Sequence, residues 1–210
     1  MTDFSLYIIT DRQINGKRSI FKSVTQSLSA GANILQMREK KISTAEMMSL
    51  GQKLQKIAAK FKVPFIINDR IDVALALQAD GVHVGQDDMP AALARRLIGR
   101  KKILGVSAKN VKQAKKAERD GADYIGVGDV FGTTSKDDAG KPIGLPVLRQ
   151  IVKSVKIPVV GIGAISKTNA ASVIQAGADG IAVISAVFGA GSPKKATLEL
   201  MQIINSSKNK

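Results

Sequence analysis

The chain has 210 residues, of which 44% are hydrophobic and 23% charged, proportions typical of a globular domain. It contains no cysteine, which excludes disulfide bonds and thiolate chemistry. Its start shows no signal-peptide pattern, and no apolar run approaches the roughly 20 residues of a membrane helix, so we expect a cytoplasmic protein with no membrane partner.

The net charge is strongly positive, because 32 Lys and Arg face 17 Asp and Glu to give +15. A charge of this size could attract nucleic acid, a membrane or small anions. No zinc-finger spacing occurs, and an aromatic content of 4% leaves few side chains for base stacking. We therefore expect no nucleic-acid partner and interpret most of the lysines as a solvated surface.

Eight short apolar segments alternate with longer amphipathic stretches, such as 44–60 and 167–175. Because the short segments are almost wholly apolar, they are typical of parallel strands covered on both faces. The predicted strands are Leu6–Thr10, Ile34–Arg38, Pro64–Asn68, Gly81–Gly85, Ile103–Ser107, Tyr124–Gly128, Pro158–Gly163 and Gly180–Ser185.

A short repeat precedes every second predicted strand. Its copies read Ala-Gly-Ala-Asn at 30–33, Gln-Ala-Asp-Gly at 78–81, Asp-Gly-Ala-Asp at 120–123 and Ala-Gly-Ala-Asp at 176–179. The small residues permit a tight turn from helix to strand. Recurrence at every second unit favours a closed α/β barrel of the (β/α)8, or TIM, class over an open sheet. We expect a single domain over residues 1–210, with a frayed tail at 205–210.

In such barrels the active site lies at the mouth, where the carboxyl ends of the strands meet. Alternation along the second predicted strand puts Gln36, Arg38 and Lys40 on one side, facing the mouth. A planar guanidinium and a mobile ammonium suit a phosphate or diphosphate. The alternative, an ion pair with Glu39 at the rim, is less favoured because Glu39 points the other way.

Carboxylates follow the next two predicted strands. Asn68 and Asp69 end the third, and Asp87 and Asp88 follow the fourth. Neighbouring strands lie about 4.8 Å apart, so these oxygens could converge. Helix capping would also explain an Asp there, but two carboxylates beside a diphosphate suit Mg²⁺, and we expect Mg²⁺ as the cofactor. The single histidine, His83, lies within a strand, and we expect it to be packed and hydrogen-bonded in the core.

The later strands end in turns rich in hydroxyl groups and glycine. The segment 129–141 carries Thr133, Ser135 and Lys136, a combination typical of an anion cradle or a lid. The turns at Gly163–Ala164 and Ile184–Ser185 follow the seventh and eighth strands, the recurrent phosphate site of TIM barrels. Two anion sites, one with a metal, predict an enzyme that joins two phosphorylated molecules or expels diphosphate from one.

A set of short motifs stands in order at the strand ends. The motifs are Leu6-Tyr7-Ile8-Ile9-Thr10-Asp11, Gln36-x-Arg38-x-Lys40, Asn68-Asp69, His83-x-Gly85-Gln86-x-Asp88, Gly105-Val106-Ser107, Phe131-x-Thr133-x-Ser135-Lys136 and Ile184-Ser185. Together they resemble the thiamine-phosphate synthase (thiamine-phosphate pyrophosphorylase) family over essentially the whole chain. The resemblance implies a transferase that condenses 4-amino-2-methyl-5-(diphosphooxymethyl)pyrimidine with a thiazole phosphate, giving thiamine phosphate and diphosphate through a pyrimidinylmethyl cation.

The resemblance also implies a role for each site residue. The pyrimidine and its diphosphate would be held by Gln36, Arg38, Lys40, Asn68, Ser107 and Lys136, of which Arg38, Lys40, Ser107 and Lys136 would be catalytic. Mg²⁺ would be bound by Asp69 and Asp88. The thiazole phosphate would be held by Thr133, Ser135, Gly163, Ala164, Ile184 and Ser185. The loop 129–141 would close to keep water from the cation.

Two positions depart from the family, since Ala164 stands where a glycine is usual and Asp129 where a proline is usual. Related thiazole tautomerases share the barrel but typically lack the metal carboxylates and have a catalytic histidine at the position of Lys109. A non-catalytic phosphate-binding barrel would have no need of Asn68, Asp69, Asp88 and Lys136 together. The sequence leaves both a monomer and a homo-oligomer open.

Overall fold

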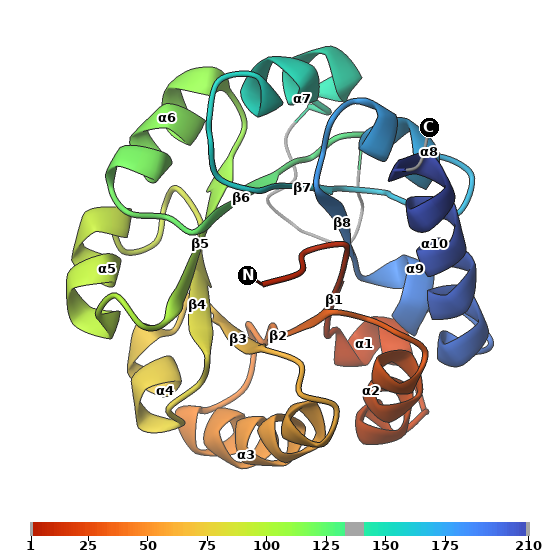
Figure 1. Ribbon diagram of the computed structural model, residues 1–210. Helices are drawn as coiled ribbons and strands as arrows, with labels where there is room; N and C mark the ends of the chain where they lie inside the picture. The colour runs from red at the N-terminus through yellow and green to blue at the C-terminus, as the bar shows by residue number, and fades with distance from the viewer. Residues whose placement is uncertain (1, 133–140, 209–210) are drawn as a thin grey trace.

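The computed structural model describes residues 2–132 and 141–208. Eight parallel strands pair in chain order into a closed barrel, and helices surround it (Figure 1). The strands are β1 Leu6–Ile9, β2 Ile34–Met37, β3 Phe65–Asn68, β4 Gly81–Val84, β5 Ile103–Ala108, β6 Tyr124–Val127, β7 Val159–Ile162 and β8 Gly180–Val183. The predicted (β/α)8 barrel is therefore confirmed, and each predicted strand overlaps an observed one.

The helices follow the strands as the sequence pattern indicates. The helices are α1 Arg12–Asn15, α2 Ile20–Ser29, α3 Thr44–Lys60, α4 Ile71–Ala76, α5 Ala91–Ile98, α6 Val111–Arg119, α7 Gly144–Val152, α8 Ala170–Gln175, α9 Ser185–Phe188 and α10 Pro193–Lys208. Helix α3 has its predicted bounds because Ser43 and Glu46 form a capping box, in which each side chain accepts a hydrogen bond from the other residue's backbone N–H.

Side chains alternate along each strand between two separate cores. On β1, Leu6 and Ile8 pack outward against the helices, whereas Tyr7 and Ile9 belong to a cluster inside the barrel. The interior cluster consists of Phe4, Tyr7, Ile9, Ile34, Ile66, Tyr124, Val160, Ala182 and Ile184. Because Gln36 lies two residues beyond Ile34 on β2, its side chain also faces the interior, nearer the mouth.

The end of the chain corrects one expectation. A frayed tail was predicted over 205–210, but helix α10 continues from Asn205 to Lys208, and residues 209 and 210 lie outside the described residues. Tertiary contacts override the weak local preference, because Ile204 is fully buried and the Lys208 ammonium donates a hydrogen bond to the Ser5 hydroxyl at 2.7 Å. Ser5 precedes β1, so the last turn of α10 is fixed to the base of the barrel.

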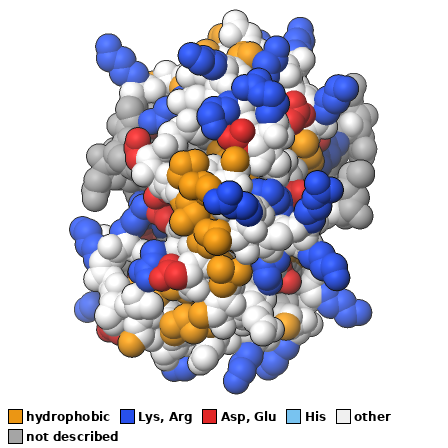
Figure 2. All heavy atoms as spheres, turned by 90° about the vertical axis from the view of Figure 1, so that its left-hand side faces the viewer, with side chains coloured by type: hydrophobic (Ala, Val, Ile, Leu, Met, Phe, Trp, Pro, Cys, Tyr) orange, Lys and Arg blue, Asp and Glu red, His pale blue; other side chains and the backbone are white. Residues whose placement is uncertain are grey.

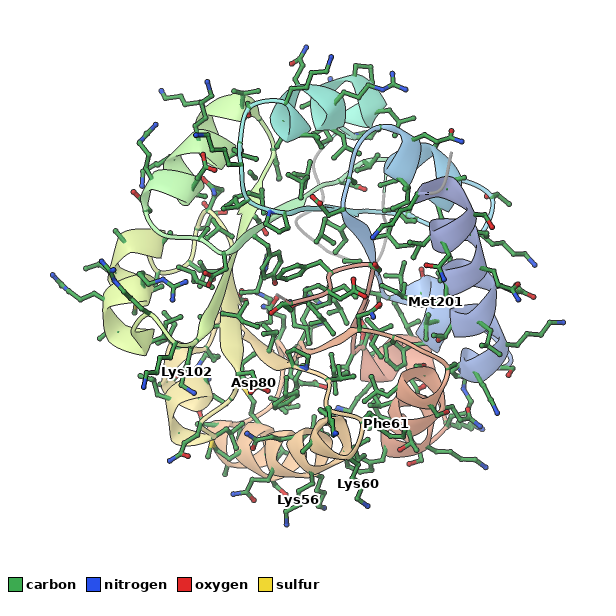
Figure 3. The ribbon with its side chains drawn as sticks, viewed as in Figure 1. Lys56, Lys60, Phe61, Asp80, Lys102 and Met201 are labelled. Atoms are coloured by element: carbon green, nitrogen blue, oxygen red, sulfur yellow. The ribbon has the colours of Figure 1, made fainter. Side chains whose placement is uncertain are left out.

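The repeated turn before every second strand forms a hydrogen-bonded clamp at the end opposite the mouth. In each copy the side chain of Asp or Asn accepts a hydrogen bond from a backbone N–H near the start of the preceding strand. The pairs are Asn33 with Leu6 at 3.0 Å, Asp80 with Phe65 at 2.8 Å, Asp123 with Leu104 at 2.7 Å and Asp179 with Val159 at 2.8 Å. Figure 3 labels Asp80, which lies in the turn before β4. Each clamp thus joins an odd-numbered strand to the strand that follows it.

Loss of one clamp should reduce stability and leave the mouth intact. We expect Asp179→Ala to lower the free energy of unfolding by about 2 kcal/mol, because the buried Val159 N–H loses its acceptor. Urea unfolding measures this loss, and kinetic constants should not change. Asp120→Ala is the control, since Asp120 pairs with Lys116 on the surface and should cost less than about 1 kcal/mol. Equal losses would show that the hydrogen bond at Val159 adds nothing.

Positive side chains are spread over the face of the molecule that carries α5 (Figure 2). Figure 2 shows Lys and Arg side chains scattered across the face that carries α5, as expected for a solvated surface. A band of hydrophobic side chains crosses the same face, where Leu75 of α4 and Leu93 and Leu97 of α5 are exposed. None of the helices formed by the described residues is long and apolar enough to cross a membrane.

Candidate active site

A cavity of about 250 Å³ lies at the carboxyl ends of the strands. Its lining includes the predicted residues Gln36, Arg38, Lys40, Asn68, Asp69, Asp88, Ser107 and Gly163. Three other predicted residues do not line this cavity: Ala164 lies in the turn after β7, Ile184 directly follows β8, and Ser185 begins α9. Thr133, Ser135 and Lys136, with most of the predicted lid, fall outside the described residues. The structure therefore unites the candidates that the sequence placed at the ends of β2, β3, β4 and β5.

The end of β2 supplies the two cations. Arg38 and Lys40 both line the cavity, as the alternation along the strand predicts. The Arg38 side chain is only 14% exposed, whereas Lys40 is half exposed and forms an ion pair with the Asp69 carboxylate. Glu39 instead pairs with Arg12 at 2.9 Å. The rim ion pair that the sequence left as an alternative for Arg38 and Lys40 is therefore not formed with Glu39.

The two predicted metal carboxylates meet. Asp69 follows β3 with a φ of 60°, a left-handed conformation that Asp tolerates better than most residues. Its carboxyl group lies within hydrogen-bonding reach of the Asp88 carboxyl group, which also accepts a hydrogen bond from the Gly85 N–H at 2.7 Å. Burial raises the pKa of Asp69, the Lys40 ammonium opposes that rise, and the neighbouring Asp88 adds to it. The predicted convergence of the carboxylates is confirmed.

The charge and donor set of the cavity fit a hard divalent cation. Its described lining carries four carboxylates, Asp69, Asp87, Asp88 and Asp129, against three cations, Arg38, Lys40 and Lys109. Over residues 2–132 and 141–208, no cluster of three or more His, Cys, Asp or Glu side chains could hold a metal by itself. Mg²⁺ commonly binds one or two carboxylates and completes its shell with phosphate oxygens and water. Asp69 and Asp88 could therefore hold Mg²⁺ together with an anionic ligand.

A chain of hydrogen bonds crosses the barrel interior next to the cavity. The Gln36 amide donates to the Tyr7 hydroxyl at 2.7 Å, and the Tyr7 hydroxyl lies 2.8 Å from that of Tyr124. The Tyr124 hydroxyl is 2.8 Å from His83 Nδ1, and His83 Nε2 is 2.9 Å from Ser107 Oγ. His83 is hydrogen-bonded as predicted, but it is only half-buried and lines the cavity instead of lying wholly in the core.

The two tyrosines of the chain were missed as site residues. Both are 1% exposed and both line the cavity, and burial raises the pKa of each hydroxyl, so both stay protonated. A signal was available, because Tyr7 pairs in register with Ile34 and Tyr124 with Gly105, each two residues before a predicted site residue. They were missed because their neighbours in the sequence are apolar, so each tyrosine was taken as one more buried core residue of its strand.

The turn after β7 explains the acidic departure at position 129. Gly163 has a φ of 111°, and a Cβ there would lie 1.8 Å from Asp129 Oδ1, so only glycine fits. Asp129 is buried, and its Oδ1 accepts a hydrogen bond from the Gly132 N–H at 3.1 Å. The carboxylate therefore fixes the start of the segment that the sequence predicted as a lid.

The alanine departure leaves a strained residue. Ala164 is exposed and has a φ of 47°, in the left-handed region that glycine adopts without cost. We expect Ala164→Gly to raise the free energy of unfolding by about 1 kcal/mol, measured by urea unfolding. The control is Ala59→Gly on the exposed face of α3, which should lower it by about 1 kcal/mol. If Ala164→Gly also lowered the free energy of unfolding, the backbone at Ala164 would not be strained.

Known proteins resemble this chain along its whole length. The family described as thiamine monophosphate synthase matches residues 6–187. The thiamine-phosphate synthase of Roseiflexus castenholzii is 54% identical over 198 residues, which cover 94% of this chain and 87% of that protein. The thiamine-phosphate synthase of Moorella thermoacetica is 47% identical over 210 residues, which cover 100% of both.

A solved structure agrees in fold as well as sequence. The structure described as thiamine phosphate pyrophosphorylase from Pyrococcus furiosus has a TM-score of 0.90 and 45% identity, and the match covers 98% of each chain. The family match, these relatives and the closed barrel agree with the strand-end residues gathered at one cavity. The chain therefore belongs to the thiamine monophosphate synthase family, whose members are transferases.

Proposed function

We propose that this enzyme condenses 4-amino-2-methyl-5-(diphosphooxymethyl)pyrimidine with a thiazole phosphate in a Mg²⁺-dependent reaction, giving thiamine phosphate and diphosphate. The observation that carries the proposal is the meeting of Asp69 and Asp88 with Lys40 and Arg38 at one cavity. Paired carboxylates and paired cations suit a diphosphate bound through a metal on one side and through direct hydrogen bonds on the other.

In this reaction the protein must stabilise diphosphate as the leaving group. The bond between the pyrimidine methylene carbon and the diphosphate oxygen breaks, and its electron pair leaves with the diphosphate. Arg38 and Lys40, with Lys136 from the segment outside the described residues, would neutralise the charge that develops there. Bound Mg²⁺ would supply further charge neutralisation to the phosphate oxygens. The ring nitrogen of the thiazole then forms the new bond to the cationic carbon.

The other parts of the site would hold the two ring systems. Gln36, Asn68 and Ser107 line the cavity beside the cations and would bind the pyrimidine. The thiazole phosphate would be bound by Thr133, Ser135, Gly163, Ala164, Ile184 and Ser185, and closure of the 129–141 segment would exclude water. A cytoplasmic location and the absence of a nucleic-acid partner belong to the same proposal, and the sequence leaves both a monomer and a homo-oligomer open.

The direct test follows diphosphate release from the purified protein. With both substrates and Mg²⁺ present, we expect diphosphate and thiamine phosphate to form in equal amounts, and chelation of the metal should stop both. Release of diphosphate without Mg²⁺ would contradict the metal role. Binding of either substrate without turnover would instead favour a barrel that only binds phosphorylated ligands.

A further inference from the structure

The geometry points to Tyr7, Tyr124 and His83 as positioning residues that set the orientation of two groups in the cavity, the Gln36 amide and the Ser107 hydroxyl. The three side chains come from β1, β6 and β4, and they link Gln36 on β2 to Ser107 on β5 through unbroken hydrogen bonds of 2.7–2.9 Å. We call the hydrogen-bonded chain from Gln36 through Tyr7, Tyr124 and His83 to Ser107 the relay. It connects the two sides of the barrel mouth through the interior.

Glycines clear the path of the relay. A Cβ on Gly105 would lie 2.2 Å from the Tyr124 ring and 2.4 Å from His83 Nδ1, in the space where these two groups form their hydrogen bond. A Cβ on Gly126 would lie 2.9 Å from the His83 ring. Any larger residue at position 105 would separate Tyr124 from His83. Gly105 on β5 and Gly126 on β6 therefore leave the space that the hydrogen bonds of the relay require.

The count of hydrogens gives the relay one direction. The buried Tyr7 hydroxyl accepts from the Gln36 amide, and the Tyr124 oxygen is the acceptor that its described contacts offer to its own hydrogen, so Tyr7 donates to Tyr124. Tyr124 then donates its own hydrogen to His83 Nδ1, which must carry a lone pair. A neutral imidazole with an unprotonated Nδ1 carries its hydrogen on Nε2, which donates to Ser107 Oγ. The Ser107 hydroxyl hydrogen is thereby available to a ligand in the cavity.

The same direction fixes what Gln36 presents. One of its two Nε2 hydrogens is donated to Tyr7, which orients the amide, and the carbonyl oxygen is the acceptor that this amide offers to a ligand. The cavity thus combines an acceptor at Gln36 with a donor at Ser107, which suits a ligand that carries an amino group and an acceptor. The aminopyrimidine of the proposed reaction is such a ligand, and this identification of the ligand rests on the proposed function.

The single histidine of the chain allows a direct test of the relay. Protein labelled with ¹⁵N at histidine contains one imidazole, whose two nitrogen resonances report which nitrogen carries the proton. At neutral pH we expect Nε2 in the protonated position and Nδ1 in the unprotonated position. The reverse tautomer, a protonated ring or averaged resonances would overturn the inferred direction. This measurement needs no substrate, so its outcome is separate from that of the proposed function.

A variant then tests whether the relay positions the ligand. Tyr124→Phe removes the central hydroxyl and keeps the ring. We expect His83 to lose its single tautomer and the KM of the aminopyrimidine diphosphate to rise about tenfold, while the KM of the thiazole phosphate does not change. Phe4→Leu is the control, because the Phe4 ring packs on Tyr124 with centroids 4.7 Å apart and takes no part in the hydrogen bonds. It should leave the tautomer and both KM values unchanged.

The outcomes separate positioning from packing. A purely structural Tyr124 would lower the melting temperature in Tyr124→Phe without changing the tautomer or the ratio of the two KM values, and this result would overturn the inference. Equal rises of both KM values would do the same. If the wild-type protein shows the expected tautomer but releases no diphosphate, the proposed function fails and the relay stands.

Discussion

Replacing Asp69 with Asn should reduce Mg²⁺-dependent diphosphate release by more than about 100-fold, because a neutral amide is a poor ligand for a hard cation. The variant keeps the size of the side chain, and Asn tolerates the left-handed φ of 60° at this position as well as Asp does. Asp69→Ala is a poorer choice, since alanine would also carry the cost of that backbone conformation.

The stability of Asp69→Asn should be unchanged or slightly higher near neutral pH. The pKa of Asp69 is raised in the folded protein by burial, so the carboxyl group holds its proton more tightly there than in the unfolded chain. Ionisation above the unfolded pKa therefore favours unfolding, and stability falls as the pH rises through the folded pKa. Asparagine removes this cost. The ion pair lost with Lys40 is half exposed and contributes little.

The measurements for this variant are steady-state diphosphate release over a range of Mg²⁺ concentrations and urea unfolding without metal. Asp87→Asn is the matched control, because Asp87 is exposed at the rim of the same cavity and should retain most of the turnover. A large loss of stability in Asp69→Asn with turnover preserved would show that Asp69 is a structural residue.

Removal of Lys40 should have opposite effects on two ligands. Its ammonium is paired with the Asp69 carboxylate, so Lys40 and a cation compete for the same oxygens. In Lys40→Ala we expect the protein alone to bind Mg²⁺ roughly fivefold more tightly, because a competing positive charge is gone. Inorganic diphosphate should bind about tenfold more weakly, because one direct cation is lost.

Isothermal titration of each ligand separately, followed by the turnover assay, measures these effects. Lys41→Ala is the control, since Lys41 is an exposed neighbour that does not line the cavity, and it should change neither affinity by more than about twofold. Weaker binding of Mg²⁺ to Lys40→Ala would contradict the competition. Unchanged diphosphate binding would remove Lys40 from the proposed leaving-group site.

The positions predicted correctly from the sequence depend on local rules. Alternation along a strand was enough to bring Arg38 and Lys40 to one cavity, and the spacing of adjacent parallel strands was enough to bring Asp69 to Asp88. Both rules hold in any regular barrel. The repeat before the even strands was read as a tight turn, which is correct but incomplete, because the acceptor role of Asp179 involves a strand 20 residues away.

The features that the sequence did not predict depend on distance across the barrel. Tyr7 and Tyr124 meet although β1 and β6 are not neighbours, and their contact depends on two long side chains spanning the interior. His83 was placed in the core because an interior strand position normally means packing. Its exposure to the cavity depends on Gly105 and Gly126, whose missing side chains leave room around the ring.

The four clamps at the base of the barrel also divide the sheet into repeating units. Each unit is a pair of consecutive strands tied by a side chain from its own connecting turn, so no unit borrows a clamp from another. A chain that was cut and rejoined between β4 and β5 would keep all these ties within continuous segments, whereas a cut between β3 and β4 would split one of them.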